Sequence, residues 1–342
     1  MMVNSNYTLP AQTTTYYEIC SEIGTLINST VESHIVGFEA YINPTTAKYV
    51  HHFVLYAGDS CEMYSRMAMT VIWIWAPGYR GAVFPNEAGV RILGIGGFRV
   101  FRLQYHYDNP SKDQGVVDTS GFYFYTSVKL RTHDVGILQL GDPMVFKSKE
   151  PVRNAEGNGY SKLSLTSAAA ECSDLFTADK VTVFDRFLHM HQAGEHMVTK
   201  HYAKGGMLKR TDSVDFFDFR EQGAFSPPTT GAGFTIDKGD YFLLDCYYYQ
   251  AEGQNIIFGL GSHEEMCIDF VYYYPRQEKP RGGVCLPTAD SLQQPTAVLS
   301  SERDLGRKYG SCSRATLLRG RHSAVASLAM TLLLSMVWAC RE

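Results

Sequence analysis

The sequence reads YFLLDCYYYQ over residues 241–250 and DFVYYYP over residues 269–275, and these two stretches carry its clearest structural signal. Both are dense in aromatic residues, which are enriched in β-strands. The same bias extends over the whole chain, which has 22 Tyr and 19 Phe among 342 residues. Long runs with helical periodicity are nearly absent, so the sequence predicts an all-β protein.

Comparable runs form two series, broken by turn-forming pairs such as Asn43-Pro44 and Asn109-Pro110. Residues 111–121, between the series, are polar and lack periodicity, which is typical of a domain boundary. We expect strands at residues 34–42, 50–57, 69–76, 98–107, 122–130, 135–141, 180–191, 241–249 and 267–274. This spacing predicts two antiparallel β-sandwich domains. Residues 161–170 could form one short helix or a loop.

We therefore divide the chain into a first domain (residues 1–115), a second domain (residues 116–285) and a linker with an apolar tail (residues 286–342). The tail contains AVASLAMTLLLSMVWAC at residues 324–340. This run is a little shorter than the roughly 20 apolar residues that span a bilayer. It also fits the C-terminal signal for a lipid anchor. Membrane attachment and a tail without such a role both stay open.

The charge of the chain argues against one class of partner, the nucleic acids. The formal net charge is −4, and no run of Lys and Arg is interleaved with aromatic residues. Both features argue against nucleic-acid binding. The hydrophobic content of 45% is ordinary for a globular protein that can bury a core.

Eight cysteines are scattered along the chain, and none forms a C-x-x-C pair. In a β-rich chain, such cysteines indicate disulfides formed in an oxidising compartment. Glycosylation sequons at Asn6 and Asn28 agree with a secretory or extracellular location. The opening residues, MMVNSNYTLP, contain no signal peptide, so we expect the N-terminus to be incomplete.

Two histidine pairs are candidate metal ligands. His189 and His191, in an H-x-H pattern, would share one face of a strand, with Cα atoms about 6.5–7 Å apart. Their imidazoles could converge on one metal ion, although exposed pairs of this kind are common. His51 and His52 are neighbours and should point to opposite faces. One metal can take both only where the strand ends, twists or bulges; otherwise one is in the core and one at the surface.

His106 and Met266 complete the candidate set. His106 lies near the end of an expected strand, where a histidine can reach a cleft or serve a structural role. A buried methionine is usually core filler, but its thioether is a good ligand for soft Cu(I). Five histidines and one methionine suggest a three-His site and a softer two-His, one-Met site. Spacing alone does not establish this grouping.

These residues and their surroundings resemble the copper type II, ascorbate-dependent monooxygenases, a family with dopamine β-monooxygenase, MOXD-like and peptidylglycine α-hydroxylating branches. The matching stretches follow in the same order from about residue 7 to residue 285. They include YTLPAQTTTYYEIC, YVHHFVLYA, RLQYHYDNP, FLHMHQAGEHM and SHEEMCIDFVYYYP.

The resemblance implies two copper ions per chain, held by jelly-roll-like sandwiches that face each other across an open cleft. His51, His52 and His106 would hold the electron-donating copper. His189, His191 and Met266 would hold the copper where O2 and the substrate react, with ascorbate as the reductant. Gln104 matches a position that helps to couple the cleft to the first copper, and a surface glutamine is the alternative.

The resemblance also implies three disulfides, Cys20–Cys61, Cys172–Cys285 and Cys246–Cys267, whereas Cys312 and Cys340 have no counterpart. The last of the three bridges would fix the strand that carries Met266.

Substrate choice is less well defined. Phe187 stands where the peptide-processing branch carries an arginine, so the chain is closer to the dopamine β-monooxygenase and MOXD-like side. We expect a small-molecule substrate, with a phenethylamine-type amine as one candidate. Asp269 or Glu195 could pair with such an amine, or be structural. The alternatives are a peptidylglycine-type hydroxylase and a copper-binding extracellular module without turnover. The oligomeric state stays open.

Overall fold

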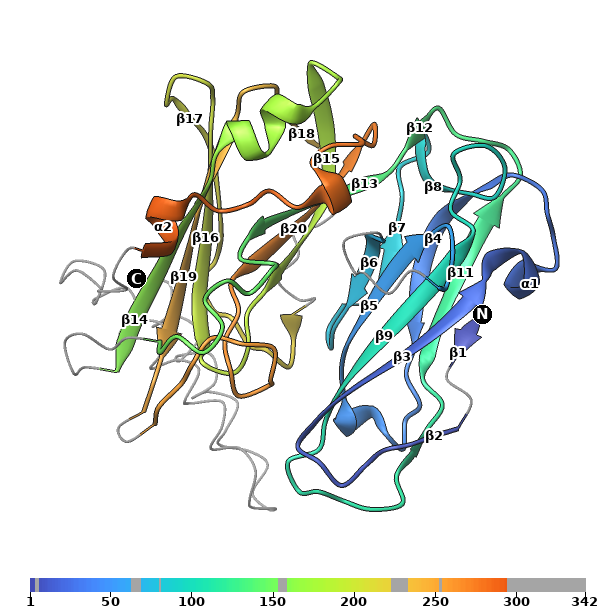
Figure 1. The fold of residues 1–342 in the computed structure, drawn as a ribbon, viewed down its shortest axis with the longest axis horizontal. Helices are drawn as coiled ribbons and strands as arrows, with labels where there is room; N and C mark the ends of the chain where they lie inside the picture. The colour runs from blue at the N-terminus through green and yellow to red at the C-terminus, as the bar shows by residue number, and fades with distance from the viewer. Residues whose placement is uncertain are drawn as a thin grey trace, which may run out of the picture.

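The computed structural model describes residues 1–3, 6–62, 69–79, 81–152, 159–222, 233–251 and 254–293. Its strands form two bodies that lie side by side, blue to cyan and green to orange in Figure 1. Each body consists mainly of two sheets, and nearly every strand pair is antiparallel. The predicted fold of two antiparallel β-sandwiches is confirmed.

The first sandwich packs a larger sheet against a four-stranded one. The strands of the larger sheet are β1 (Met2–Val3), β4 (Ser33–Tyr41), β7 (Gly81–Val83), β8 (Ala88–Ile92), β11 (Gly121–Ser127) and β12 (His133–Asp134). Those of the second sheet are β3 (Thr14–Glu22), β5 (Val50–Gly58), β6 (Thr70–Trp75) and β9 (Val100–Asp108), in the order β3-β9-β5-β6. A separate ladder joins β2 (Tyr7–Thr8) and β10 (Val117–Asp118). Phe38, Trp73 and Phe122 pack against one another between the two sheets and are nearly inaccessible to solvent.

The second sandwich has two four-stranded sheets. One has the order β13-β20-β15-β18 and contains β13 (Gly136–Gly141), β15 (Lys180–His189), β18 (Phe234–Asp237) and β20 (Ile268–Tyr274). The other has the order β14-β19-β16-β17 and contains β14 (Tyr160–Ser167), β16 (Gly194–Tyr202), β17 (Leu208–Val214) and β19 (Tyr241–Tyr249). The described helices are short: α1 (Ile23–Ile27), α2 (Ala289–Gln293), η1 (Ala47–Tyr49), η3 (Ala169–Glu171), η4 (Ser173–Leu175) and η6 (Arg281–Gly283).

The structure differs from expectation at residues 161–170. Most of this segment lies in β14, which pairs with β19 along its whole length. Leu163 and Leu165 are buried at alternate positions, separated by small polar residues. This period of two is a strand pattern, and it was obscured because serines, Ser161 and Ser167, occupy the buried positions on either side of the leucines.

By strand pairing, the first sandwich extends past residue 115 to β12, and the second sandwich begins with β13. β11 pairs with β4, and β12 pairs with β8, so both belong to the first sandwich. β13 is the first strand of the second sandwich. The polar stretch at residues 111–121 is a loop and a short ladder within the first sandwich.

The structure forms three disulfides, Cys20–Cys61, Cys172–Cys285 and Cys246–Cys267, which are the pairs that the resemblance implies. The last bridge ties β19 to the residue that precedes β20. Asn6 and Asn28 are both exposed. Cys312, Cys340 and the apolar run at residues 324–340 lie outside the described residues. Among the described helices, none has the length and apolar character needed to cross a bilayer.

The two sandwiches share an apolar cluster. Phe187, Phe270 and Tyr272 of the second sandwich pack in the same buried cluster as the core residues of the first. Hydrogen bonds cross the junction; among them, the Ile74 N–H donates to the Tyr272 hydroxyl (3.2 Å), and the Tyr79 hydroxyl donates to Asp185 (2.8 Å). This junction brings the sheet of β5, β6 and β9 against the sheet of β13, β15 and β20.

Candidate metal centre

A group of three buried histidines lies on two neighbouring strands of the first sandwich. His51 and His52 come from the start of β5, and His106 comes from β9. The register between these strands shifts between Val50 and His52, so that His52 pairs with His106 and His51 is the extra residue. Such a bulge turns a side chain out of the normal alternation. It resolves the conflict between neighbouring histidines and simple strand geometry.

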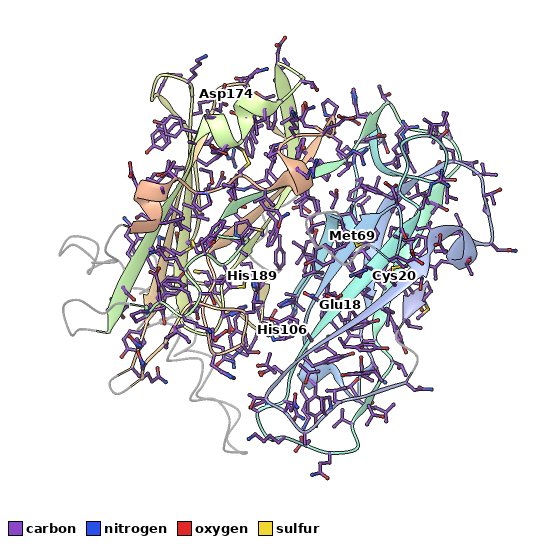
Figure 2. All side chains as sticks on the ribbon, in the orientation of Figure 1. Glu18, Cys20, Met69, His106, Asp174 and His189 are labelled. Carbon is purple, nitrogen blue, oxygen red and sulfur yellow. A yellow bond between two sulfur atoms is a disulfide. The ribbon has the colours of Figure 1, made fainter. Side chains whose placement is uncertain are left out.

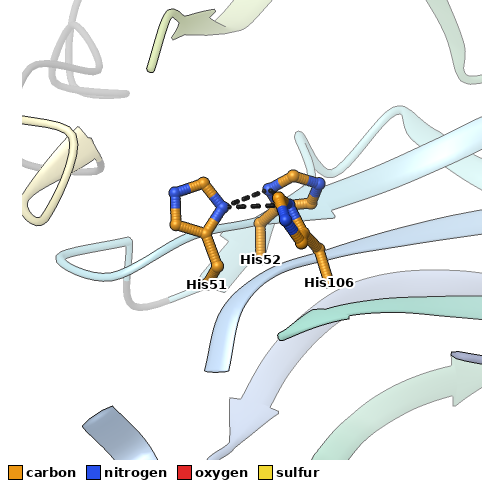
Figure 3. A group of neighbouring side chains, drawn as sticks. All are labelled: His51, His52 and His106. Carbon is orange, nitrogen blue, oxygen red and sulfur yellow. Dashed lines mark hydrogen bonds between the residues drawn. The ribbon is translucent and has the colours of Figure 1, made fainter. Parts of the chain in front are cut away.

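The three rings direct their Nδ1 atoms toward one point (Figure 3). The Nδ1 atom of His51 lies 2.9 Å from that of His52 and 3.1 Å from that of His106, and the latter two are 3.3 Å apart. Three imidazole nitrogens bound to one ion at about 2.0–2.1 Å form a triangle of about this size. Without a cation at the centre, the nitrogen lone pairs would face one another. The arrangement therefore fits a bound metal.

His106 is held by contacts on both sides of its ring. The Ser262 hydroxyl lies 3.1 Å from its Nε2 atom, which leaves Nδ1 as the nitrogen that faces His51 and His52. The Tyr16 ring stacks on it, with centroids 4.4 Å apart. Because Ser262 belongs to the second sandwich, one loop of that sandwich buttresses the three-histidine group of the first.

His189 and His191 lie at the end of β15 and are oriented by different partners. The Nδ1 atom of His189 lies 2.8 Å from Oε1 of Gln222, whose amide nitrogen donates to a backbone carbonyl. The Nδ1 atom of His191 lies 3.0 Å from the carbonyl oxygen of Glu264. Both contacts place the proton on Nδ1, so Nε2 carries the lone pair. The buried Nε2 atom of His191 has no hydrogen-bond partner among the described residues, which is expected of a metal ligand.

The backbone of Met266 is held in place by Glu265, by Tyr248 and by a disulfide. The Glu265 carboxylate accepts N–H bonds from His191 (2.9 Å) and Ala193 (2.5 Å), so it ties the Met266 segment to the H-x-H segment. The Tyr248 hydroxyl donates to the Met266 carbonyl (2.9 Å), and the disulfide at Cys267 follows. Met266, His189 and His52 line one cavity.

Burial keeps all five imidazoles neutral. It lowers the pKa of His51 to about 3 and that of His189 to about 4. The pKa values of His52, His106 and His191 also lie well below the usual value, because burial and the neighbouring imidazoles disfavour the charged form. A histidine binds a metal only when it is neutral, so the five rings are ready to bind at neutral pH.

The two histidine groups lie closer together than the open cleft implied by the resemblance. The ring centroids of His52 and His189 are 5.3 Å apart, and those of His51 and His191 are 5.6 Å apart. Figure 2 places His106 and His189 at the junction of the two bodies. The shared apolar cluster closes the sandwiches against each other, and the cleft is reduced to a cavity.

This cavity has about 620 Å³ of empty space, part of it continuous with solvent. Its lining comes from both sandwiches: Tyr16, His52, Val54, Tyr56, Val71, Ile74, Gln104, Gln139, Pro143, His189, Leu260, Met266, Ile268 and Phe270. Gln104 is only 3% exposed, and its amide nitrogen donates to Glu18. It is therefore a cavity residue and not a surface glutamine.

Other predicted contacts lie elsewhere. Asp269 is buried in an ion pair with Arg186 and accepts a hydrogen bond from Thr199, so it is structural. Glu195 does not line the described cavity.

Sequence reasoning missed Tyr16, Gln139, Gln222, Ser262 and Glu265 as site residues. Glu265 lies in the motif that contains Met266, so its position was a usable signal. Ser262 begins the same stretch, whereas Gln222 carries no signal of its own, because only the folded chain brings it to His189.

Comparison with known protein families identifies this arrangement. Residues 1–114 match the model of the copper type II ascorbate-dependent monooxygenase N-terminal domain, and residues 133–291 match that of the C-terminal domain. Similar proteins include tyramine beta-hydroxylase of Caenorhabditis briggsae, which is 30% identical over 72% of this chain and 43% of its own length.

DBH-like monooxygenase protein 1 of Homo sapiens is 26% identical over 86% of this chain and 49% of its own length. Dopamine beta-hydroxylase of Equus caballus is 28% identical over 79% of this chain and 45% of its own length. The chain thus spans less than half the length of these relatives. By the match of both domain models and the order of its histidine motifs, it belongs to the copper type II ascorbate-dependent monooxygenase family.

Proposed function

We propose that this chain is a dicopper, ascorbate-dependent monooxygenase that hydroxylates a C–H bond of a small molecule. One observation carries the proposal: five neutral, buried imidazoles divide into a group of three and a group of two, and Met266 lines the same cavity as His189 of the pair. Family membership supplies the reaction class.

The copper ions would supply one-electron transfer and activation of O2. One oxygen atom enters the C–H bond and the other leaves as water, with two electrons from two ascorbate molecules and two protons from solvent. The remaining chemistry belongs to the residues of the chain, which bind, orient and exclude water.

The first copper would be held by the Nδ1 atoms of His51, His52 and His106. Ser262 and the Tyr16 ring keep His106 in place. Three nitrogen ligands from two adjacent strands make a rigid site, which suits an electron donor because little has to move when its charge changes.

The second copper would be held by the Nε2 atoms of His189 and His191 and by the thioether of Met266. Gln222 and the Glu264 carbonyl hold the Nδ1 protons, and the Glu265 carboxylate keeps the Met266 segment beside the histidine pair. A thioether favours Cu(I), which is the form that reacts with O2.

The substrate would occupy the cavity between the sandwiches, beside His189 and Met266. A peptidylglycine substrate is disfavoured because Phe187, where that branch has arginine, is fully buried and packs against Tyr79, with ring centroids 5.7 Å apart. Relatives named for tyramine and dopamine make a phenethylamine-type amine one candidate.

We also propose a secretory or extracellular location, which the three disulfides and the exposed sequons at Asn6 and Asn28 support. Membrane attachment through residues 324–340 is part of this proposal. It predicts that a chain ending at residue 293 is released in soluble form, whereas the full chain fractionates with membranes.

Copper content and ascorbate-dependent O2 consumption test the function. Two coppers per chain and O2 uptake that rises with added small-molecule substrates would support it. Tight copper binding without substrate-dependent O2 uptake would favour the alternative of a copper-binding module without turnover.

A further inference from the structure

We propose that the cavity between the sandwiches selects a neutral aromatic molecule with a hydroxyl group, and not an ammonium ion, as its substrate. This inference rests on the proposed function, because it names the class of molecule that the same site takes, and it replaces the phenethylamine-type amine as the substrate.

The wall on the first sandwich is an apolar sheet face with an amide at its edge. Gln104 on β9 pairs with Val54 on β5, and Val54 pairs with Ile74 on β6. Cross-strand partners share a face, so the three side chains form one row. Val71 lies on the same wall, and beyond Gln104 the row continues to Glu18 on the edge strand β3.

The wall on the second sandwich has the same design. Gln139 on β13 pairs with Phe270 on β20, and Phe270 pairs with Phe187 on β15. The next residue on this face of β20 is Ile268, the partner of His189. This explains why Asp269, which lies between Ile268 and Phe270, points away from the cavity.

Hydrogen bonds fix the orientation of both amides. The amide nitrogen of Gln104 donates to the carboxylate of Glu18, and that of Gln139 donates to the Gly282 carbonyl (2.8 Å). Because both partners can only accept, the amide groups cannot be reversed. Each Oε1 atom accepts no hydrogen bond from another described residue. The cavity therefore offers two carbonyl oxygens, one from each sandwich, to a hydrogen-bond donor.

The lining formed by the described residues contains no Asp, Glu, Lys or Arg side chain. The carboxylate closest along these rows is Glu18, which is already paired with Gln104 and with Arg102 (3.6 Å). An ammonium ion in this space would lose water without gaining a counter-ion, and bound copper would add further positive charge. A neutral hydroxyl needs only one acceptor, and either glutamine oxygen can provide it.

The test compares two ligands of nearly equal shape. Tyramine carries an ammonium group where 4-propylphenol carries a methyl group. Both are titrated at pH 7 by calorimetry into the copper-loaded, oxidised chain without ascorbate, and into the metal-free chain, where no amine can bind to copper. We expect 4-propylphenol to bind at least about tenfold more tightly in both forms. Equal or tighter binding of tyramine to the metal-free chain, or no binding of either ligand, overturns the proposal.

The double variant Gln104→Leu/Gln139→Leu tests the role of the hydroxyl acceptors, because either oxygen can serve alone. The variant keeps the size of both side chains but removes both carbonyl oxygens. It should reduce the ratio of affinities for 4-propylphenol and propylbenzene by about tenfold, because a buried hydroxyl loses its acceptor. A merely structural role would weaken both ligands alike and leave this ratio unchanged.

Leu260 allows a gain of function, because it lines the cavity and is 41% exposed, so a polar substitution is tolerated. Leu260→Glu adds a carboxylate to the lining, and Leu260→Gln is the matched neutral control. We expect the Glu variant alone to bind tyramine more tightly, by about tenfold. If both variants behave alike, charge does not control selection and the proposal fails.

These ligand measurements do not depend on turnover. Copper content and ascorbate-dependent O2 uptake are recorded on the same preparations. Preference for the phenol without copper binding would sink the proposed function and leave the cavity assignment standing. Copper binding and O2 uptake with a preference for tyramine would support the proposed function and overturn the cavity assignment.

Discussion

The imidazole rings of His52 and His189 lie 5.3 Å apart, centre to centre, although the two residues belong to different sandwiches. Through this contact, the two histidine groups form one buried cluster of five rings. Burial lowers the pKa of every ring, and at His52 and His191 the neighbouring imidazoles lower it further, because a charged imidazole would lie against another one. The stability of the metal-free chain should therefore depend strongly on pH.

Because of the five imidazoles, we expect the metal-free folded chain to lose stability at acidic pH. They stay neutral in the folded chain, whereas in the unfolded chain they take up protons below a pH of about 6.5. The unfolded state then binds more protons, so stability is present above this pH and is lost as the pH falls. Each histidine contributes up to about 1.4 kcal/mol per pH unit.

Urea denaturation of the metal-free chain at pH 5 and pH 7 measures this effect. His191→Gln should reduce the difference in stability between the two pH values, and His133→Gln, on β12 and outside the cluster, is the control. An unchanged difference in the His191 variant would contradict the account.

Asp185 should make stability depend on pH in the opposite direction. Burial raises its pKa to about 6, although the Tyr79 hydroxyl donates a hydrogen bond to it across the junction. The folded chain therefore favours the protonated acid. Its contribution is complete below a pH of about 3.8 and is lost as the pH rises to about 6, on the order of 2–3 kcal/mol. Asp185→Asn, which stays neutral, should gain stability over the native chain across this window. No relative gain would show that Asp185 is not strained by its charge.

Glu265 should control the second copper site without touching the first. Its two carboxylate oxygens accept the N–H groups of His191 and Ala193, and Glu265→Gln replaces one acceptor by a donor. We expect Cu(I) affinity at the second site to fall by roughly tenfold or more, as is usual when a ligand loses its support. The first site should keep its affinity. Competition with a Cu(I) chelator separates the two sites, and equal weakening of both would point to a general loss of folding.

Met266→Ala should leave the first copper bound and abolish substrate-dependent O2 uptake. The thioether is the soft ligand of the second site, and alanine offers none. Met190→Leu is a matched control, because Met190 lies between the two histidines but is buried in the apolar core of the second sandwich. Full activity of the Met266 variant would refute its assignment as a ligand.

The fold could be predicted well from the sequence where aromatic runs dominate, as in β19 and β20. It was harder to predict where small polar residues fill some of the buried positions, as Ser161 and Ser167 do in β14. The pairing of β11 with β4 is not visible in the sequence either, because β11 follows a polar loop that resembles a linker.

The candidate ligands could be identified from motifs, but their geometry could not. Nothing local to His51 and His52 announces the bulge that lets both face His106, because it depends on the register against β9. Likewise, Gln222 reaches His189 and Ser262 reaches His106 only through the packing of distant segments. The two histidine groups lie close together because the sandwiches share an apolar cluster. The spacing of the histidines in the sequence does not predict this contact.

Metal analysis of the purified chain, combined with X-ray absorption of its reduced form, tests the central claim most directly. The account predicts about two coppers per chain, with nitrogen ligands at about 2.0 Å and one sulfur ligand at about 2.3 Å that disappears in Met266→Ala. Zinc alone, no metal, or a copper spectrum that is the same with and without Met266 would contradict it.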